Sequence, residues 1–175
     1  MSFNGKGESV KRLFIIRHAK SSWSQPGLDD FDRPLNKRGQ NDGPEMARRL
    51  SNAGARPDLI VASPAKRAKK TAQFMADGTG YDPAKIRYVE DLYLGSLSVH
   101  LQLLASLFNE ADTLFLVGRN DTLTRLAEYL SGKNLGNIPT CGIVALEYAD
   151  DFGFTTIAGM GKLLFFWFPK DHQEV

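Results

Sequence analysis

Apolar positions along the chain fall into two kinds of pattern. Short continuous apolar runs predict buried strands at about residues 10–17, 58–62, 86–89 and 113–117. Apolar stripes at helical spacing predict helices at about 37–53, 65–76, 97–109 and 122–130. Because strands and helices alternate, we expect an α/β fold: an open, mainly parallel sheet with helices on both faces.

The last part of the chain has a different pattern. Apolar runs at 142–148, 154–158 and 162–168 follow one another without helical spacing between them, and the turn-like residues 150–153 separate the first two. We therefore expect antiparallel C-terminal strands added to the parallel sheet. No linker or repeat divides the chain, and 175 residues with 42% hydrophobic content suit one domain over 1–175.

Polar residues mark the expected ends of the first helix. Asn36 is a suitable N-cap before residue 37, because its side-chain oxygen can accept a bond from a free backbone N–H. Gly54 and Pro57 then end the helix.

Composition narrows the class of protein. The lone cysteine, Cys141, excludes an intramolecular disulfide and a cysteine-based zinc cluster. The N-terminus has no long apolar stretch, so we expect a cytoplasmic protein without a membrane partner. Residues 1–70 hold 15 Lys and Arg against 7 Asp and Glu, which fits either attraction of anionic substrates or solvated helix faces. Basic and aromatic residues do not alternate, so no nucleic-acid partner is expected.

Charged residues follow three of the predicted strands. Arg17 and His18 end the first, residues 63–67 follow the second, and residues 118–120 follow a later one. A lone Arg-His pair at a strand end usually only reaches solvent. In an open α/β sheet, however, ligands bind beyond the carboxyl ends of the strands, where these three segments meet. Their convergence predicts a site for a phosphoryl group.

Several motifs together resemble a known family. Residues 17–23 read Arg-His-Ala-Lys-Ser-Ser-Trp, residues 30–39 read Asp-Phe-Asp-Arg-Pro-Leu-Asn-Lys-Arg-Gly, and residues 63–72 read Ser-Pro-Ala-Lys-Arg-Ala-Lys-Lys-Thr-Ala. Leu92-Tyr93, residues 116–118 and residues 138–142 continue the match in the same order. The chain resembles the histidine phosphatase superfamily, and within it the small SixA-type phosphohistidine phosphatases. The resemblance implies a phosphoglycerate mutase-like fold.

The resemblance also implies roles for particular residues: His18 as the nucleophile, with Arg17 and Arg67 as phosphate ligands. Cationic neighbours lower the pKa of a histidine, so His18 is expected to stay neutral and nucleophilic. Its attack on phosphorus would form a phosphohistidine intermediate, which water then hydrolyses. No metal or cofactor is required. The expected partner is a phosphorylated protein, such as a histidine-phosphotransfer domain, or a small phosphorylated substrate.

One segment departs from the family pattern. Family members ordinarily show Gly-His-Asn-Pro after the late strand, whereas this chain has Gly118-Arg119-Asn120-Asp121. Arg119 can bind phosphate, but an arginine does not exchange protons near neutrality. The protein is then either an enzyme acting on a labile phosphoramidate or a phosphate-binding signalling module with little or no turnover. Asp121 could pair with Arg119 or cap the following helix.

The remaining candidates have weaker signals. Ser63 could donate its hydroxyl to phosphate, although capping the next helix is the commoner role. Lys20 and Ser21 belong to the loop expected over the pocket and are included among the substrate-binding candidates. Gly39 is expected to allow close backbone packing. Glu90 and Asp91 could place a carboxylate near the leaving group, but a solvated pair at a strand end is the commoner arrangement. Trp23 could face the substrate, although aromatic residues more often pack. The other residues with expected non-catalytic roles are His100 (structural), His172 (frayed tail) and Cys141 (core).

Overall fold

The structure is a computed structural model that describes residues 10–148 and 153–171. Its sheet has six strands in the order β3-β2-β4-β1-β5-β6. The first four of these pair in parallel, and β5 pairs antiparallel with both of its neighbours. The strands are β1 (Lys11–Arg17), β2 (Leu59–Ala62), β3 (Arg87–Tyr88), β4 (Thr113–Gly118), β5 (Ile143–Tyr148) and β6 (Lys162–Trp167). The expected mainly parallel sheet with antiparallel C-terminal strands is confirmed.

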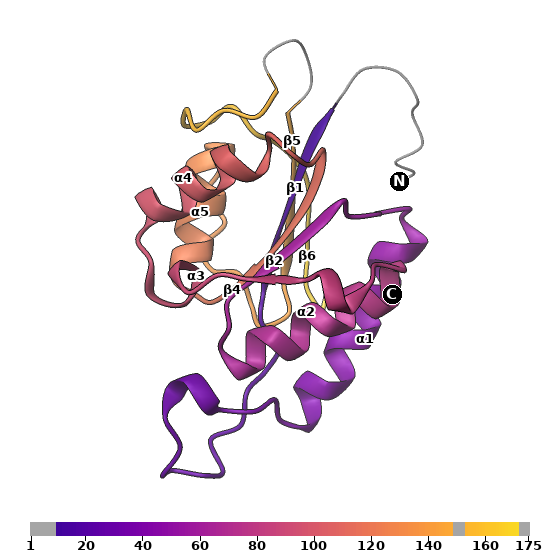
Figure 1. Ribbon diagram of the computed structural model, residues 1–175, viewed down its shortest axis with the longest axis vertical. Helices are drawn as coiled ribbons and strands as arrows, with labels where there is room; N and C mark the ends of the chain where they lie inside the picture. The colour runs from indigo at the N-terminus through magenta and orange to yellow at the C-terminus, as the bar shows by residue number, and fades with distance from the viewer. Residues whose placement is uncertain (1–9, 149–152, 172–175) are drawn as a thin grey trace.

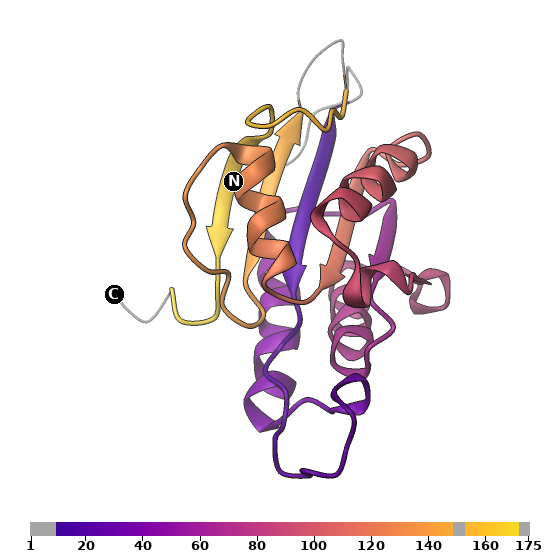
Figure 2. The ribbon, with the colours of Figure 1, turned by 90° about the vertical axis from the view of Figure 1, so that its left-hand side faces the viewer.

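Helices cover both faces of the sheet, as expected (Figures 1 and 2). One face carries α1 (Lys37–Asn52) and α2 (Lys66–Thr79). The other carries α3 (Asp91–Leu94), α4 (Leu97–Leu107) and α5 (Thr122–Ser131). Each layer encloses its own cluster of buried apolar side chains, so the core is divided by the sheet.

The central strand β1 shows why its apolar run is continuous. Phe14 and Ile16 point into the cluster beneath α1 and α2, while Leu13 and Ile15 point into the cluster beneath α4 and α5. All four side chains have no exposed surface. A strand covered on both faces needs apolar residues at every position, and β1 meets that requirement.

One predicted strand is wrong. Residues 154–158 do not pair with the sheet and have no regular structure. The ring of Phe154 instead stacks on Phe108, with centroids 4.5 Å apart, and lies edge-on to Tyr148 at 5.0 Å. Its apolar character therefore serves side-chain packing against α4. The turn expected at 150–153 lies mostly outside the described residues.

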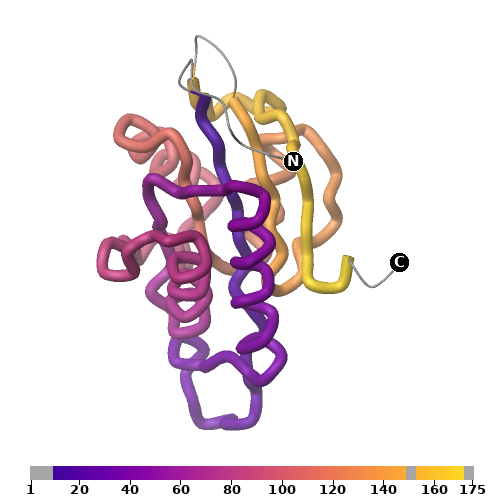
Figure 3. The backbone as a smooth tube through the Cα atoms, turned by 90° about the vertical axis from the view of Figure 1, so that its right-hand side faces the viewer, coloured from indigo at the N-terminus to yellow at the C-terminus, as the bar shows by residue number. Residues whose placement is uncertain are grey.

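A long loop, residues 18–36, joins β1 to α1 and extends past the carboxyl edge of the parallel strands (Figures 2 and 3). Its two arms are joined near the sheet, where the N–H of Asn36 donates to the carbonyl of Lys20 at 2.9 Å. The side chain of Asn36 caps α1 by accepting from the N–H of Gly39 at 2.9 Å, as predicted. A Cβ at Gly39 would lie 2.3 Å from the Lys20 carbonyl oxygen, so glycine permits this close approach.

Among the described residues, no helix is long and apolar enough to cross a membrane.

Candidate active site

His18 is the first residue beyond β1, and backbone hydrogen bonds fix it on two sides. Its N–H donates to the carbonyl of Gly118 at 2.9 Å, and its carbonyl accepts from the N–H of Cys141 at 3.0 Å. Cys141 adopts a left-handed backbone with φ of 61°, in the turn that leads into β5. The histidine is therefore held between the end of β4 and the start of β5, with only 7% of its surface exposed.

The imidazole ring is oriented by two contacts. Its Nδ1 lies 2.7 Å from the carbonyl oxygen of Ala19, which can only accept, so the proton of the neutral ring is assigned to Nδ1. The lone pair is then on Nε2, which accepts from Nε of Arg67 at 3.2 Å. Burial lowers the pKa of His18 to about 3, with further lowering by Arg67, Arg17 and Arg119, against an opposing effect of the Ala19 carbonyl. The ring is neutral at physiological pH.

Thr71 on α2 fixes the peptide that orients the ring. Its Oγ1 accepts from the N–H of Ala19 at 2.9 Å and donates to the carbonyl of Arg67 at 2.8 Å. Thr71 and Ala19 are both fully buried. Sequence reasoning gave Thr71 no role, although it lies within the quoted motif at 63–72 and one helical turn after Arg67.

Arg17 ends β1 beside His18. Its N–H donates to the carbonyl of Gly142 at 3.0 Å, and its Nη1 donates to the carbonyl of Ile138 at 2.7 Å. Burial, and then the nearby charge of Arg67, lower the pKa of Arg17. Its buried Nε has no hydrogen-bond partner among the described residues.

Arg67 and Arg119 converge on a carboxylate that sequence reasoning missed. Nη2 of Arg67 donates to Oδ2 of Asp30 at 2.9 Å, and its Nη1 donates to the Asp30 carbonyl. Nη2 of Arg119 lies 3.4 Å from the same Oδ2. The hydroxyl of Tyr93 also donates to Oδ2, at 3.0 Å. Both Asp30 and Tyr93 stand in motifs that carried the family resemblance, but neither had an assigned role.

Arg119 is positioned by Tyr93 as well as by Asp30. Its Nη1 donates to the Tyr93 carbonyl at 3.0 Å, and its guanidinium lies over the Tyr93 ring, 4.8 Å from the centroid. Its buried Nε lacks a partner in the part of the chain that the structure describes. Burial raises the pKa of Asp30, but hydrogen bonds from Arg67, Tyr93 and Arg33 outweigh this and lower it to about 2.

The expected pairing of Asp121 with Arg119 is wrong, whereas the expected capping holds only in position, because Asp121 stands at the N-cap of α5 without a side-chain bond. The ion pair of Arg119 is with Asp30, and the Asp121 side chain makes no capping bond to α5. Asn120 fills the capping role, because its Oδ1 accepts from the N–H and the hydroxyl of Thr124 at 3.1 and 2.8 Å.

The weaker binding candidates have other partners. Ser63 is fully buried, and its Oγ accepts from the N–H of Ala65 at 3.3 Å, in the turn that leads into α2. The hydroxyl of Ser21 accepts from Nη2 of Arg33 at 2.5 Å. The guanidinium of Arg33 also lies over the ring of Trp23, which is 74% exposed. Lys20 is half-buried, and its backbone carbonyl accepts from the N–H of Asn36.

The remaining candidates lie apart from this cluster. Glu90 and Asp91 are exposed at the start of α3. His100 is buried, with Nδ1 bonded to the Ser96 carbonyl at 2.8 Å. His172 lies outside the described residues. Across residues 10–148 and 153–171, no three His, Cys, Asp or Glu side chains are arranged to hold a metal ion.

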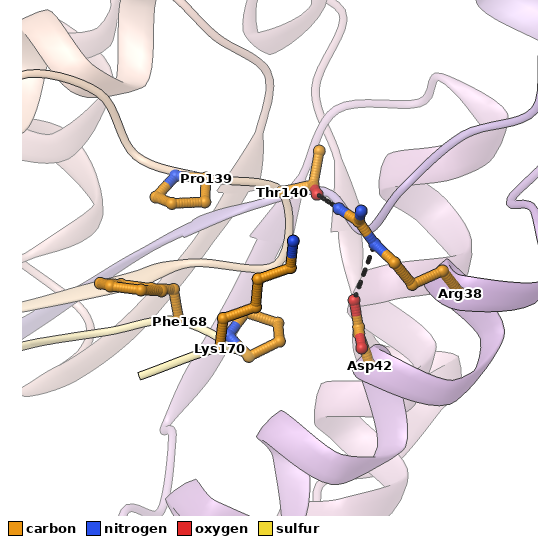
Figure 4. A pocket seen from close by; sticks show the side chains of 7 residues that line it. Arg38, Asp42, Pro139, Thr140, Phe168 and Lys170 are labelled. Carbon is orange, nitrogen blue, oxygen red and sulfur yellow. Dashed lines mark hydrogen bonds and ion pairs between the residues drawn. The ribbon is translucent and has the colours of Figure 1, made fainter. Parts of the chain in front are cut away.

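A separate pocket of about 310 Å³ is lined by the start of α1, the turn at 138–142 and the segment that follows β6 (Figure 4). Arg38 bonds there to Thr140 at 3.0 Å and pairs with Asp42 at 3.5 Å. The lining residues are Arg38, Asp42, Pro139, Thr140, Phe168, Pro169 and Lys170. None of the residues that surround the His18 ring lines this pocket.

The cluster combines a neutral, rigidly held imidazole with guanidinium groups from three segments: Arg17 at the end of β1, Arg67 on α2 and Arg119 after β4. Such a set can receive an anionic electrophile, because the arginines offset charge that gathers on its oxygens. The lone pair on Nε2 of His18 points toward the Arg67 guanidinium, from which it accepts a hydrogen bond.

Comparison with known proteins gives a consistent result. The sequence model of the histidine phosphatase superfamily (branch 1) matches residues 13–99. An uncharacterized chloroplast protein of Arabidopsis thaliana is 34% identical over 145 residues, which are 78% of this chain and 66% of that protein. The chain therefore spans slightly less than two thirds of this relative's length.

Two solved structures share the fold. The Agrobacterium tumefaciens protein assigned as the phosphohistidine phosphatase SixA is 29% identical, with a TM-score of 0.75 over 90% of this chain and 97% of that one. The protein histidine phosphatase SixA complexed with tungstate is 20% identical, with a TM-score of 0.77 over the same shares.

Proposed function

The chain belongs to the histidine phosphatase superfamily, and we propose that it hydrolyses a phosphohistidine or another small phosphorylated group through a covalent intermediate on His18. The observation that supports this most directly is the Nε2 lone pair of a neutral His18 directed at Arg67, with Arg17 and Arg119 close by. An imidazole in this state attacks phosphorus without first losing a proton.

The first step transfers the phosphoryl group. Nε2 of His18 forms a bond to phosphorus while the bond from phosphorus to the leaving atom breaks, and solvent protonates the leaving group. Nε of Arg67 gives up its contact with Nε2 and turns, with Arg17, toward the phosphoryl oxygens. The buried Nε groups of Arg17 and Arg119, which have no partner among the described residues, are further donors for these oxygens.

The second step releases the product. Water attacks phosphorus, the bond to Nε2 breaks, and orthophosphate leaves as His18 returns to its neutral form. The guanidinium groups serve both steps because both place negative charge on the same oxygens. The proton stays on Nδ1 and keeps its hydrogen bond to the Ala19 carbonyl, and this bond holds the ring in one orientation through both steps.

Arg119 favours substrates with labile leaving groups. It provides charge but no exchangeable proton near neutrality. A phosphoramidate nitrogen takes its proton from solvent, so phosphohistidine needs less help from the site than an alkyl phosphate ester does. This supports a phosphorylated protein, such as a histidine-phosphotransfer domain, as substrate. The cytoplasmic location stays a prediction.

A second function is favoured by one observation. Arg119 replaces the family's second histidine and is held by Asp30 and Tyr93, away from a proton-transfer role. Losing one group that stabilises the developing charge commonly lowers a rate by ~10²- to 10³-fold. The protein would then bind phosphorylated groups as a signalling module with little turnover.

The two functions are separated by one set of assays. The purified protein is incubated with a phosphohistidine-bearing phosphotransfer domain and with a generic phosphoramidate, beside His18→Ala and Arg119→His variants. We expect turnover by the parent and a loss on the order of 10³-fold or more in His18→Ala. Unchanged turnover in His18→Ala would exclude the nucleophile. No turnover in the parent, with a large gain in Arg119→His, would favour the binding module.

A further inference from the structure

Three donors from separate segments meet on one carboxylate oxygen in the site. Oδ2 of Asp30 accepts from Arg67 on α2 at 2.9 Å and from the hydroxyl of Tyr93 on α3 at 3.0 Å. Arg119, after β4, adds an ion pair to the same atom at 3.4 Å. This is the arrangement of donors that holds a phosphoryl oxygen in an anion site.

We propose that Asp30 is an internal anion that occupies the phosphoryl position of Arg67 and Arg119, and that a phosphorylated substrate must displace it. The proposal rests on the proposed function, because it assumes that these arginines bind the phosphoryl group. In this role, Asp30 lowers the affinity of the site for a phosphoryl group by competing with it for the two arginines.

The order of exposure supports displacement from the solvent side. The side chain of Asp30 is 40% exposed, whereas that of Arg67 is 3% exposed and that of Arg119 is 27% exposed. The carboxylate therefore lies between solvent and the more buried guanidinium of Arg67. An incoming phosphoryl group meets Asp30 before it reaches Arg67.

The guanidinium of Arg67 that contacts Asp30 also contacts the proposed nucleophile, His18. Arg67 donates through Nε to His18 and through its two terminal nitrogens to Asp30. While Asp30 holds the outer side of this guanidinium, the inner side covers the Nε2 lone pair of His18. A phosphoryl group that replaces Asp30 draws Arg67 onto its own oxygens and frees that lone pair, so binding and activation occur together.

Asp30 has a second partner that can keep it after displacement. Nη1 of Arg33 donates to its other oxygen, Oδ1, at 3.1 Å. Asp30 begins the short 3-10 helix Asp30–Asp32 in the loop beyond the sheet edge, and Arg33 follows that helix directly. The displaced carboxylate therefore stays paired with a cation on its own loop.

The opposite role for Asp30 makes the opposite prediction. If the carboxylate mainly positions Arg67 and Arg119 for the substrate, its removal loosens both guanidinium groups and weakens anion binding. If it competes with the substrate, its removal strengthens anion binding. The sign of the change decides between the two roles.

Calorimetric titration of tungstate and of orthophosphate into the full chain measures that sign. Asp30→Asn removes the charge and keeps the size of the side chain. Asp32→Asn is the matched control, because Asp32 is exposed two residues away and its side chain contacts neither arginine. We expect tungstate to bind Asp30→Asn about tenfold more tightly than the parent. The control should change the affinity by less than about twofold, since the charge of an exposed group is screened.

Equal or weaker binding by Asp30→Asn than by Asp32→Asn would overturn the proposal, as would no binding by any of the three proteins. A crystal structure of the unaltered chain with tungstate gives a second measurement that needs no variant. We expect Asp30 to have left Arg67 in that complex. Tungstate on Arg67 with the Asp30 contact intact would refute displacement.

These results are distinct from those that test the phosphatase. Tighter tungstate binding by Asp30→Asn without turnover of any phosphoramidate supports the role of Asp30 and overturns the proposed function. Turnover that depends on His18, with no gain in affinity in Asp30→Asn, does the reverse.

Discussion

Thr71→Val removes one oxygen atom behind the site and keeps the shape of the side chain. In the parent, the Thr71 hydroxyl receives the N–H of Ala19, the residue whose carbonyl orients the His18 ring. Valine fills the same volume, so no cavity forms in the core. The substitution leaves the Ala19 N–H buried without a partner, while the Arg67 carbonyl keeps its own helical bond.

The magnitude follows from that single unpaired group. A buried donor without a partner costs about 1–3 kcal/mol, and threonine and valine differ little in helix propensity. For a chain of this size, each 1 kcal/mol lowers Tm by about 2–4 °C. Thr71→Ser is the matched control, since it keeps the hydroxyl and loses only a buried methyl group, worth about 1 kcal/mol.

Two assays together test the reasoning. Urea unfolding is expected to show that both variants are destabilised. Turnover of a phosphoramidate is expected to fall about 10- to 100-fold in Thr71→Val, because the Ala19 peptide no longer fixes the ring, and to be restored in Thr71→Ser. If Thr71→Val has the parent's stability and turnover, the Ala19–Thr71 bond does not position His18. If Thr71→Ser loses as much turnover as Thr71→Val, packing and not hydrogen bonding sets the ring.

Three further predictions concern single residues. NMR titration of the His18 ring should show no protonation between pH 8 and 5, because its pKa is about 3, and titration near 6.5 would contradict the burial argument. The pKa in the unfolded chain is higher, so His18 reduces the free energy of unfolding as pH falls from about 6.5 toward 3. Gly39→Ala should lower the free energy of unfolding by about 1–3 kcal/mol, because the added Cβ clashes with the Lys20 carbonyl. Gly27→Ala is the control in thermal melts, since nothing lies within 4 Å of its added Cβ. Equal melting temperatures of the two variants would show that the loop shifts to accommodate the Cβ at residue 39. Asn36→Ala should lower the urea-derived stability by about 1 kcal/mol by removing the cap of α1, while Asn36→Ser should keep most of it, and equal losses would contradict a capping role.

The order of strands and helices was predictable because each apolar run matches the cover it receives. The run at 13–16 is continuous since helices cover both faces of β1. The segment 154–158 was misjudged because the aromatic ring of Phe154 packs equally well from an irregular segment. Apolar composition alone does not distinguish a paired strand from a segment that covers a helix.

The convergence of Arg17, His18, Arg67 and Arg119 was also predictable, since residues that follow parallel strands share one edge of the sheet. Asp30 was not, because its place depends on the path of the long loop 18–36, for which the sequence has no periodic pattern. Local rules likewise offered Asp121, two residues along the sequence, as a possible partner of Arg119. The observed partner is distant in sequence and was visible only in three dimensions.

The buried position of Cys141 has a consequence for behaviour under oxidative stress. Its thiol is the chain's only one, it has no exposed surface, and burial raises its pKa. Peroxide attacks exposed thiolates, and a protonated sulfur sealed in the core offers it no target. The proposed reaction uses the imidazole of His18 and not a thiolate. Turnover should therefore continue at peroxide concentrations that inactivate enzymes with a thiolate nucleophile.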